Sequence, residues 1–181
     1  MILESKSILL KNGQPAILRS PGAEDAAQML DYLKTTASET PFMLRYPEEC
    51  TMTEEQEAVF LQNTAESPNG LMILCEIDGK IVGNCSLSFH SFIKTRHRAD
   101  IAIGILKSHW NLGIGTAMFR EMITAAANRG VSQLELEVIE GNTRAMALYE
   151  KMGFRVFAQR PNSIRLKDGT MLKEFFMIKT L

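Results

Sequence analysis

The chain has 181 residues and a formal net charge of −1, and hydrophobic residues make up 45% of it. This length and composition predict one globular domain, residues 1–181, and exclude a largely disordered chain. The near-neutral charge argues against a nucleic-acid binder, and no uncharged stretch is long enough to span a bilayer, so we expect a cytoplasmic protein without nucleic-acid or membrane partners.

The N-terminal part predicts a β-hairpin followed by a helix. Asn12-Gly13 lies between two short apolar runs and favours a tight turn, so residues 1–15 are interpreted as an N-terminal hairpin strand. Ser20-Pro21 then marks a helix start, and apolar residues keep helical spacing up to about Ser38.

A second helix is predicted after a loop that contains two prolines. Thr53 to Gln56 form a capping box, and the helix is expected to end near Glu66. Five glutamates gather in this region, and they fit either a helix cap with a solvated face, which we favour, or attraction of a cationic substrate. These glutamates are Glu48, Glu49, Glu54, Glu55 and Glu57.

Two strands and a basic turn come next. Asp78-Gly79 is a strong hairpin signal between the apolar runs at 71–77 and 81–89. The stretch from Ile101 to Leu106 is almost wholly apolar, which is typical of a central strand covered on both faces. Four basic residues between these runs are interpreted as a solvated turn. They are Lys94, Arg96, His97 and Arg98.

The rest of the chain is organised around a strand, a glycine-bearing loop and a helix that together span Ile101 to Ala127. Gly113 and Gly115 open the helix, which is expected to stop at Asn128-Arg129-Gly130. A helix start has unpaired N–H groups and the positive end of the helix dipole, so this one can hold a phosphate. We therefore predict a pyrophosphate site there.

The next strand, Val131 to Ile139, is expected to lie parallel to the central one through a right-handed crossover. Glu135 and Glu137 alternate with apolar residues, which indicates that one face of this strand looks into a wet cleft. Asn142 can cap the helix that follows, and Tyr149 lies two turns further along the same edge.

The C-terminal segment is predicted to form closing antiparallel strands. One apolar run ends at a break at Pro161-Asn162, and two more flank Asp168-Gly169. No linker, repeat or low-complexity tract divides the chain.

The cysteines and histidines show no spacing that is typical of a disulfide framework or a metal site. The cysteines lack a CxxC pair, and the histidines form no HExxH set. We therefore predict no metal and interpret the cysteines as buried thiols. The residues are Cys50, Cys75, Cys85, His90, His97 and His109.

Three phosphate-binding classes compete for the two glycines. A P-loop is excluded because no Lys-Ser or Lys-Thr follows a GxxxxG frame. A dinucleotide fingerprint is disfavoured because its third small residue would fall on Met118 and because it usually occupies the first βαβ unit of a chain.

The third class is carried by a family resemblance. Trp110 to Gly115, WNLGIG, matches both glycines of the Q/R-x-x-G-x-G/A loop of the GNAT superfamily of acyl-CoA-dependent N-acyltransferases. Asn142 to Phe154, NTRAMALYEKMGF, is very similar to its N-x-x-A-x-x-L-Y-x-K-x-G-F segment. The likeness covers residues 16–179. It departs at Trp110, where the family carries Gln or Arg.

This resemblance implies a mixed α/β fold with a mostly antiparallel sheet, one splayed parallel pair and about four flanking helices. It also implies acetyl-CoA as acyl-donor cosubstrate, bound in large part by backbone groups. The implied cofactor-binding residues are Ile103, Gly104, Ile105, Asn111, Leu112, Gly113, Ile114, Gly115, Thr116, Asn142, Ala145 and Tyr149.

The implied reaction is direct attack of a primary amine on the thioester in a ternary complex. Tyr149 matches the family's general-acid position, and without the resemblance it would be interpreted as a packing residue. Asn142 serves equally well as a helix cap. For the general base, Glu137 is favoured over Asp100, and an ordered water relay stays open.

Two further alternatives remain at this stage. The first is a non-catalytic acyl-CoA-binding or regulatory module instead of an enzyme. The second concerns the acceptor, for which a small cationic amine is favoured over a protein or peptide N-terminus because of the acidic second-helix region. The sequence leaves the oligomeric state open, with a homodimer as one option.

Overall fold

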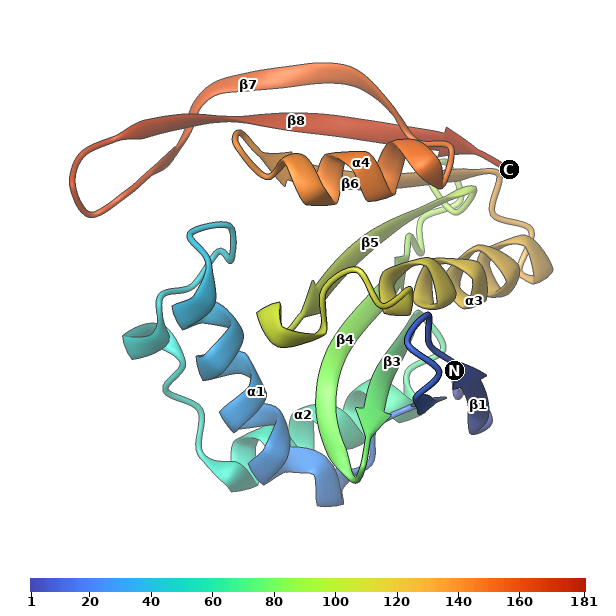
Figure 1. The fold of residues 1–181 in the computed structure, drawn as a ribbon. Helices are drawn as coiled ribbons and strands as arrows, with labels where there is room; N and C mark the ends of the chain where they lie inside the picture. The colour runs from blue at the N-terminus through green and yellow to red at the C-terminus, as the bar shows by residue number, and fades with distance from the viewer.

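Eight strands form one sheet in the order β1-β2-β3-β4-β5-β6-β8-β7. The computed structural model describes residues 1–181 (Figure 1). The strands are β1 Lys6–Leu9, β2 Pro15–Arg19, β3 Gly70–Ile77, β4 Lys80–Phe89, β5 Arg98–Ile105, β6 Gln133–Ile139, β7 Arg155–Arg165 and β8 Met171–Thr180. The helices are α1 Ala26–Glu39, α2 Glu54–Glu66, α3 Ile114–Asn128 and α4 Thr143–Lys151, with short 3-10 turns at Ala23–Asp25, Pro47–Glu49 and Lys107–His109.

The sheet is antiparallel except between β5 and β6, which confirms the expected mixed fold with one parallel pair. These two strands pair only from Arg98 to Asp100, opposite residues 133–135, and then diverge (Figure 1). The connection through α3 is the predicted parallel crossover. Beyond Asp100, the edge of β5 that faces β6 has no ladder partner.

Two hydrophobic clusters lie on opposite faces of the sheet. In β3 the alternate residues Leu71, Ile73 and Cys75 belong to the larger cluster, which also includes residues of α3 and α4. Met72 and Leu74 point the other way, into a smaller cluster with α1 and α2. The period-two alternation of a strand therefore divides the helices between the two faces.

Local signals in the sequence predicted several element boundaries correctly. Asp78 and Gly79 have φ angles of 50° and 74°, as the tight hairpin turn requires. At the start of α2, Thr53 accepts a hydrogen bond from the Gln56 N–H, and the Gln56 side chain accepts one from the Thr53 N–H. Gly130 adopts a φ of 77° at the end of α3.

Three predictions were wrong in detail. Pro161-Asn162 does not end a strand, because β7 continues across it through a register shift between Arg160 and Ile164. Arg98 is not part of a solvated turn, because it opens β5 and forms an ion pair with Glu135. The first helix begins at Ala26, after the 3-10 turn at Ala23–Asp25, and not directly at Ser20-Pro21.

The central strand β5 is not covered on both faces. Ile101 is buried, but Ala102 is exposed and residues 103–105 are only half-buried. The apolar residues of β5 therefore form one wall of the cavity between β5 and β6. None of the helices combines the length and the apolar character that a bilayer span requires.

Candidate active site

A cavity of about 540 Å³ lies where β5 and β6 diverge. Most of its lining residues are hydrophobic, and they come from the loop after α1, from β5 and β6, from α4 and from the β7-β8 hairpin. The sequence-predicted residues that line it are Asp100, Ile103, Gly104, Ile105, Glu137, Asn142, Ala145 and Tyr149. The structure thus brings the candidate catalytic groups into one cavity with part of the predicted cofactor site.

The predicted phosphate loop joins β5 to α3. Asn111 and Gly113 adopt left-handed φ angles of 67° and 97°, and Gly113 is the N-terminal cap of α3. None of the backbone N–H groups from Asn111 to Thr116 donates a hydrogen bond to a backbone carbonyl. Unpaired N–H groups at the positive end of a helix dipole fit a phosphate well. The loop residues are therefore suited to a pyrophosphate group.

Gly115 lets α3 approach α4 closely. A Cβ atom built on Gly115 would lie 2.7 Å from the Leu148 Cδ2 atom and 3.4 Å from the Ile105 Cδ1 atom. Real Cβ atoms do not come that close to a carbon of a packed side chain. A side chain at Gly115 would force the Leu148 side chain to shift, so the second glycine of the loop relieves crowding beside the cavity.

Trp110 connects the glycine loop to the end of β5. Its indole Nε1 donates a hydrogen bond of 2.8 Å to the Ile105 carbonyl, and the Arg144 guanidinium lies over its ring at 4.3 Å from the centroid. Arg144 also donates to the Asn111 side-chain oxygen at 2.8 Å. Trp110 therefore ties the loop to the end of β5, a role that the sequence pattern did not indicate.

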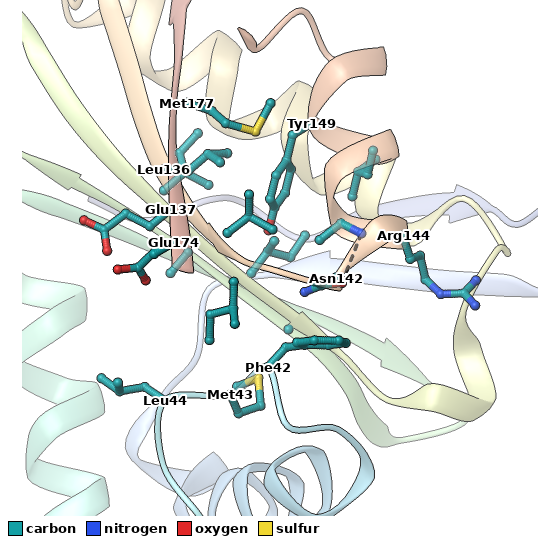
Figure 2. A pocket seen from close by; sticks show the side chains of 18 of the residues that line it. Phe42, Met43, Leu44, Leu136, Glu137, Asn142, Arg144, Tyr149, Glu174 and Met177 are labelled. Carbon is teal, nitrogen blue, oxygen red and sulfur yellow. Dashed lines mark hydrogen bonds between the residues drawn. The ribbon is translucent and has the colours of Figure 1, made fainter. Parts of the chain in front are cut away.

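Asn142 and Tyr149 lie along one edge of α4, as predicted. The Asn142 Oδ1 atom accepts a hydrogen bond from the Ala145 N–H at 3.2 Å, so Asn142 caps the helix while it also lines the cavity. Tyr149 is 7% exposed and packs on Phe119 and Phe154. Burial raises the pKa of Tyr149 to about 12. Figure 2 shows its hydroxyl end directed into the cavity.

Two carboxylates stand side by side across the cavity from Tyr149 (Figure 2). Glu137 comes from β6 and Glu174 from β8, where Glu174 lies opposite Ile139. Glu174 is 8% exposed, accepts a hydrogen bond of 2.8 Å from the Ser163 hydroxyl, and lies 3.5 Å from Arg160. No sequence motif marked Glu174, because only the sheet register places it beside Glu137.

The surroundings of Glu137 shift its pKa upward. Partial burial raises its pKa, and the charge and hydrogen bonding of Glu174 raise it further, whereas Arg160 opposes the shift. Asp100 contributes a small effect in the same direction as Glu174. Among the carboxylates of the cavity, Glu137 therefore combines access to the cavity with a pKa above its ordinary value.

The other two acidic residues of the cavity are already engaged with cationic or ionisable neighbours. Glu135 accepts hydrogen bonds from Arg98, one of them at 2.6 Å, and these lower its pKa. The Asp100 side chain is 56% exposed, and one of its oxygens lies 2.9 Å from the His90 Nε2 atom. Asp100 thus lies at an open edge of the cavity, where water reaches it.

The wall opposite α4 is made by three residues that no sequence motif marked, namely Phe42, Met43 and Leu44 (Figure 2). They lie in the loop between α1 and α2, and with Phe157 and Phe176 of the β7-β8 hairpin they make the lining largely apolar. The glutamates of the second-helix region do not line the cavity. Glu48 is paired with Lys167, and Glu57 is buried.

Comparisons with known proteins show the family of this chain. The model of the acetyltransferase (GNAT) family matches residues 32–154. The L-amino acid N-acetyltransferase AaaT of Escherichia coli is 28% identical over 120 residues, which are 65% of this chain and 73% of that protein. The [ribosomal protein bS18]-alanine N-acetyltransferase of Escherichia coli is 40% identical over 57 residues, which are 32% of this chain and 38% of that protein.

A solved structure is similar over nearly the whole chain. It is an acetyltransferase of the GNAT family from Streptococcus pneumoniae, with a TM-score of 0.86 and 28% identity, and the match covers 92% of this chain and 99% of that one.

Proposed function

Since this chain belongs to the acetyltransferase (GNAT) family, we propose that it transfers an acetyl group to a primary amine by direct attack in a ternary complex. The chain is accordingly an acetyl-CoA-dependent acyltransferase and not a purely regulatory acyl-CoA-binding module. The observation that carries the proposal is the cavity that holds Tyr149 and Glu137 and extends to Trp110, the residue that precedes the loop of unpaired N–H groups.

The residues of the donor side fit acetyl-CoA. Unpaired backbone N–H groups of the loop would hold the pyrophosphate. They belong to Asn111, Leu112, Gly113, Ile114, Gly115 and Thr116. The unpaired edge of β5 at Ile103, Gly104 and Ile105 offers backbone groups to the pantetheine, and Asn142 and Ala145 line the same side. Bound acetyl-CoA supplies an acetyl thioester, whose carbonyl the β5 backbone would polarise.

Tyr149 is proposed as the general acid that protonates the leaving thiolate. Its phenol is buried, and burial alone accounts for the rise of its pKa to about 12. With this raised pKa the phenol stays protonated at neutral and moderately basic pH. The hydroxyl is therefore held in its proton-donating form.

Glu137 is proposed as the general base that removes a proton from the attacking amine. An amine with a pKa near 10.4 is almost fully protonated at neutral pH, so a base is needed. A carboxylate with a raised pKa is a better proton acceptor than an ordinary one. Asp100 and a water relay are the competing candidates.

Replacing Glu137 with Gln is expected to lower kcat/KM about 100-fold, because the acceptor would have to lose its proton to solvent. The affinity for acetyl-CoA should not change, since Glu137 lies on the acceptor side. Steady-state kinetics and calorimetry on the same preparations would measure both quantities. Asp100→Asn is the matched control, and a larger loss in Asp100→Asn than in Glu137→Gln would transfer the role of base to Asp100.

Replacing Glu174 with Gln is expected to shift the acidic limb of the pH profile of kcat/KM to lower pH. Glu174 raises the pKa of Glu137, so its removal lowers that pKa and Glu137 stays deprotonated further into the acid range. Arg160 and Asp100 also face Glu137 and remain in place. Glu140→Gln, on a residue that pairs with Lys173, is the control. An acidic limb that stays in place, or that moves to higher pH, contradicts the coupling between Glu174 and Glu137.

For the acceptor, a small cationic amine is proposed. The earlier reason for it, the acidic second helix, does not apply, because those glutamates lie outside the cavity. Glu137 and Glu174 supply negative charge inside the cavity instead, and apolar side chains surround them. A peptide N-terminus is the second candidate, because a segment of the chain is 40% identical to an enzyme that acetylates an alanine of ribosomal protein bS18.

The function is tested by following acetyl-CoA consumption over pooled amines, polyamines, aminoglycosides and peptides. Turnover with a non-peptide amine supports the first candidate, and turnover with peptides alone supports the second. If calorimetry on the folded protein shows no binding of acetyl-CoA, the proposed function is wrong.

A further inference from the structure

The N-terminal hairpin reaches the phosphate loop. Lys11, in the turn between β1 and β2, donates its backbone N–H to the Leu112 carbonyl at 3.0 Å. The turn is held in place at its base, because Leu10 is 4% exposed in the larger core cluster and its N–H bonds to the Gln14 carbonyl. A segment about 100 positions away in sequence is therefore fixed against the loop.

The side chain of Lys11 lies over Gly113. A Cβ atom built on Gly113 would lie 3.6 Å from the Lys11 Cγ atom and 3.9 Å from its Cε atom. The methylene stem thus runs along the glycine backbone, and its ammonium group takes part in none of the ion pairs of this structure. By contrast, Lys6 in the same hairpin pairs with Glu121 at 2.6 Å.

The loop itself lacks the Gln or Arg side chain of its signature pattern. Trp110 stands at the Gln or Arg position, and its indole N–H is used by the Ile105 carbonyl. Arg144 and Lys151 border the loop from α4, where they contact Asn111 and Thr116. Lys11 approaches the loop from the β1-β2 hairpin. It lies outside residues 32–154, which match the family model.

We propose that Lys11 is a ligand for the pyrophosphate of acetyl-CoA and that the N-terminal hairpin completes the phosphate site. The proposal rests on the proposed function, since it assumes that acetyl-CoA binds to this loop. The backbone N–H groups would take the phosphate oxygens, and the ammonium of Lys11 would add a charge at Gly113. Lysine serves as a point charge here, so the geometry does not require a bidentate contact.

The test compares Lys11→Met with wild type by calorimetry, with CoA and 3′-dephospho-CoA as the probes. Methionine keeps an unbranched stem over Gly113 and removes the charge, so the affinity for both probes is expected to fall about five-fold at low salt. The difference should shrink at high salt because screening weakens the ion pair. Lys11→Arg should stay within about two-fold of wild type.

Lys94→Met, in an exposed turn, is the matched control for the loss of one positive charge. An affinity of Lys11→Met equal to that of Lys94→Met overturns the proposal. A loss confined to CoA, with 3′-dephospho-CoA unaffected, also overturns it, because Lys11 would then act on the 3′-phosphate. Failure of the wild type to bind either probe is a different result, since it rejects the proposed function itself.

Discussion

Replacing Tyr149 with Phe is expected to lower kcat about 100-fold, while the affinity for acetyl-CoA changes by less than about two-fold. The substitution removes one hydroxyl, and the packing of the ring on Phe119 and Phe154 is preserved. In the proposed function the cofactor is held in large part by backbone groups of the loop and of β5, so its affinity should not respond. The leaving thiolate, however, would have to take its proton from water.

Tyr46→Phe is the matched control, because the Tyr46 hydroxyl accepts a hydrogen bond from the Lys167 N–H outside the cavity. Single-turnover kinetics would separate the chemical step from product release. The rate on the basic side should not fall near the ordinary tyrosine pKa of about 10, because burial raises the pKa of Tyr149 to about 12. If Tyr149→Phe retains wild-type turnover, Tyr149 is not the acid.

Replacing Gly113 with Val is expected to weaken acetyl-CoA binding by about 50-fold or more, because a β-branched residue resists a left-handed φ and turns the loop N–H groups away from the phosphate. The φ of Gly113 is 97°, and a Cβ atom there would contact the stem of Lys11. A loss of stability of about 1–3 kcal/mol should accompany the strain. Calorimetry would measure binding, and thermal unfolding would measure stability.

Gly130→Val separates strain from binding. Gly130 lies at the other end of α3 with a φ of 77°, and a Cβ there would meet no atom within 4 Å. This variant should lose comparable stability and keep its affinity for acetyl-CoA. Equal affinities in the two variants would mean that the conformation of Gly113 does not matter for the cofactor.

The parts that could be predicted from sequence depend on neighbours along the chain. The Asp78-Gly79 turn, the Thr53 capping box and the Asn142 cap are made by residues within a few positions of one another, so their chemistry can be inferred locally. The spacing of Asn142 and Tyr149 places both on one edge of a helix for the same reason. These short-range patterns also carried the family resemblance.

The surroundings of the predicted residues could not be inferred in this way. Glu174 meets Glu137 because β8 pairs with β6 in a particular register, and a shift of one residue would turn it to the other face of the sheet. The apolar run of β5 predicts a strand that is covered on both faces, and this prediction is wrong because periodicity alone does not distinguish a buried face from a cavity wall. The face of β5 is a cavity wall and not a buried face because β5 diverges from β6.

Sequence by itself determined the glycine loop and the helix that carries Tyr149, because local turn, cap and periodicity signals encode both. The family resemblance of these segments implied the class of fold. Only the tertiary structure decided which groups surround them. The backbone N–H of Lys11 bonds to the loop, the Trp110 indole bonds to the Ile105 carbonyl, and Arg98 forms an ion pair with Glu135. Such contacts depend on strand order and register, which are set by packing of the whole core and not by any short segment.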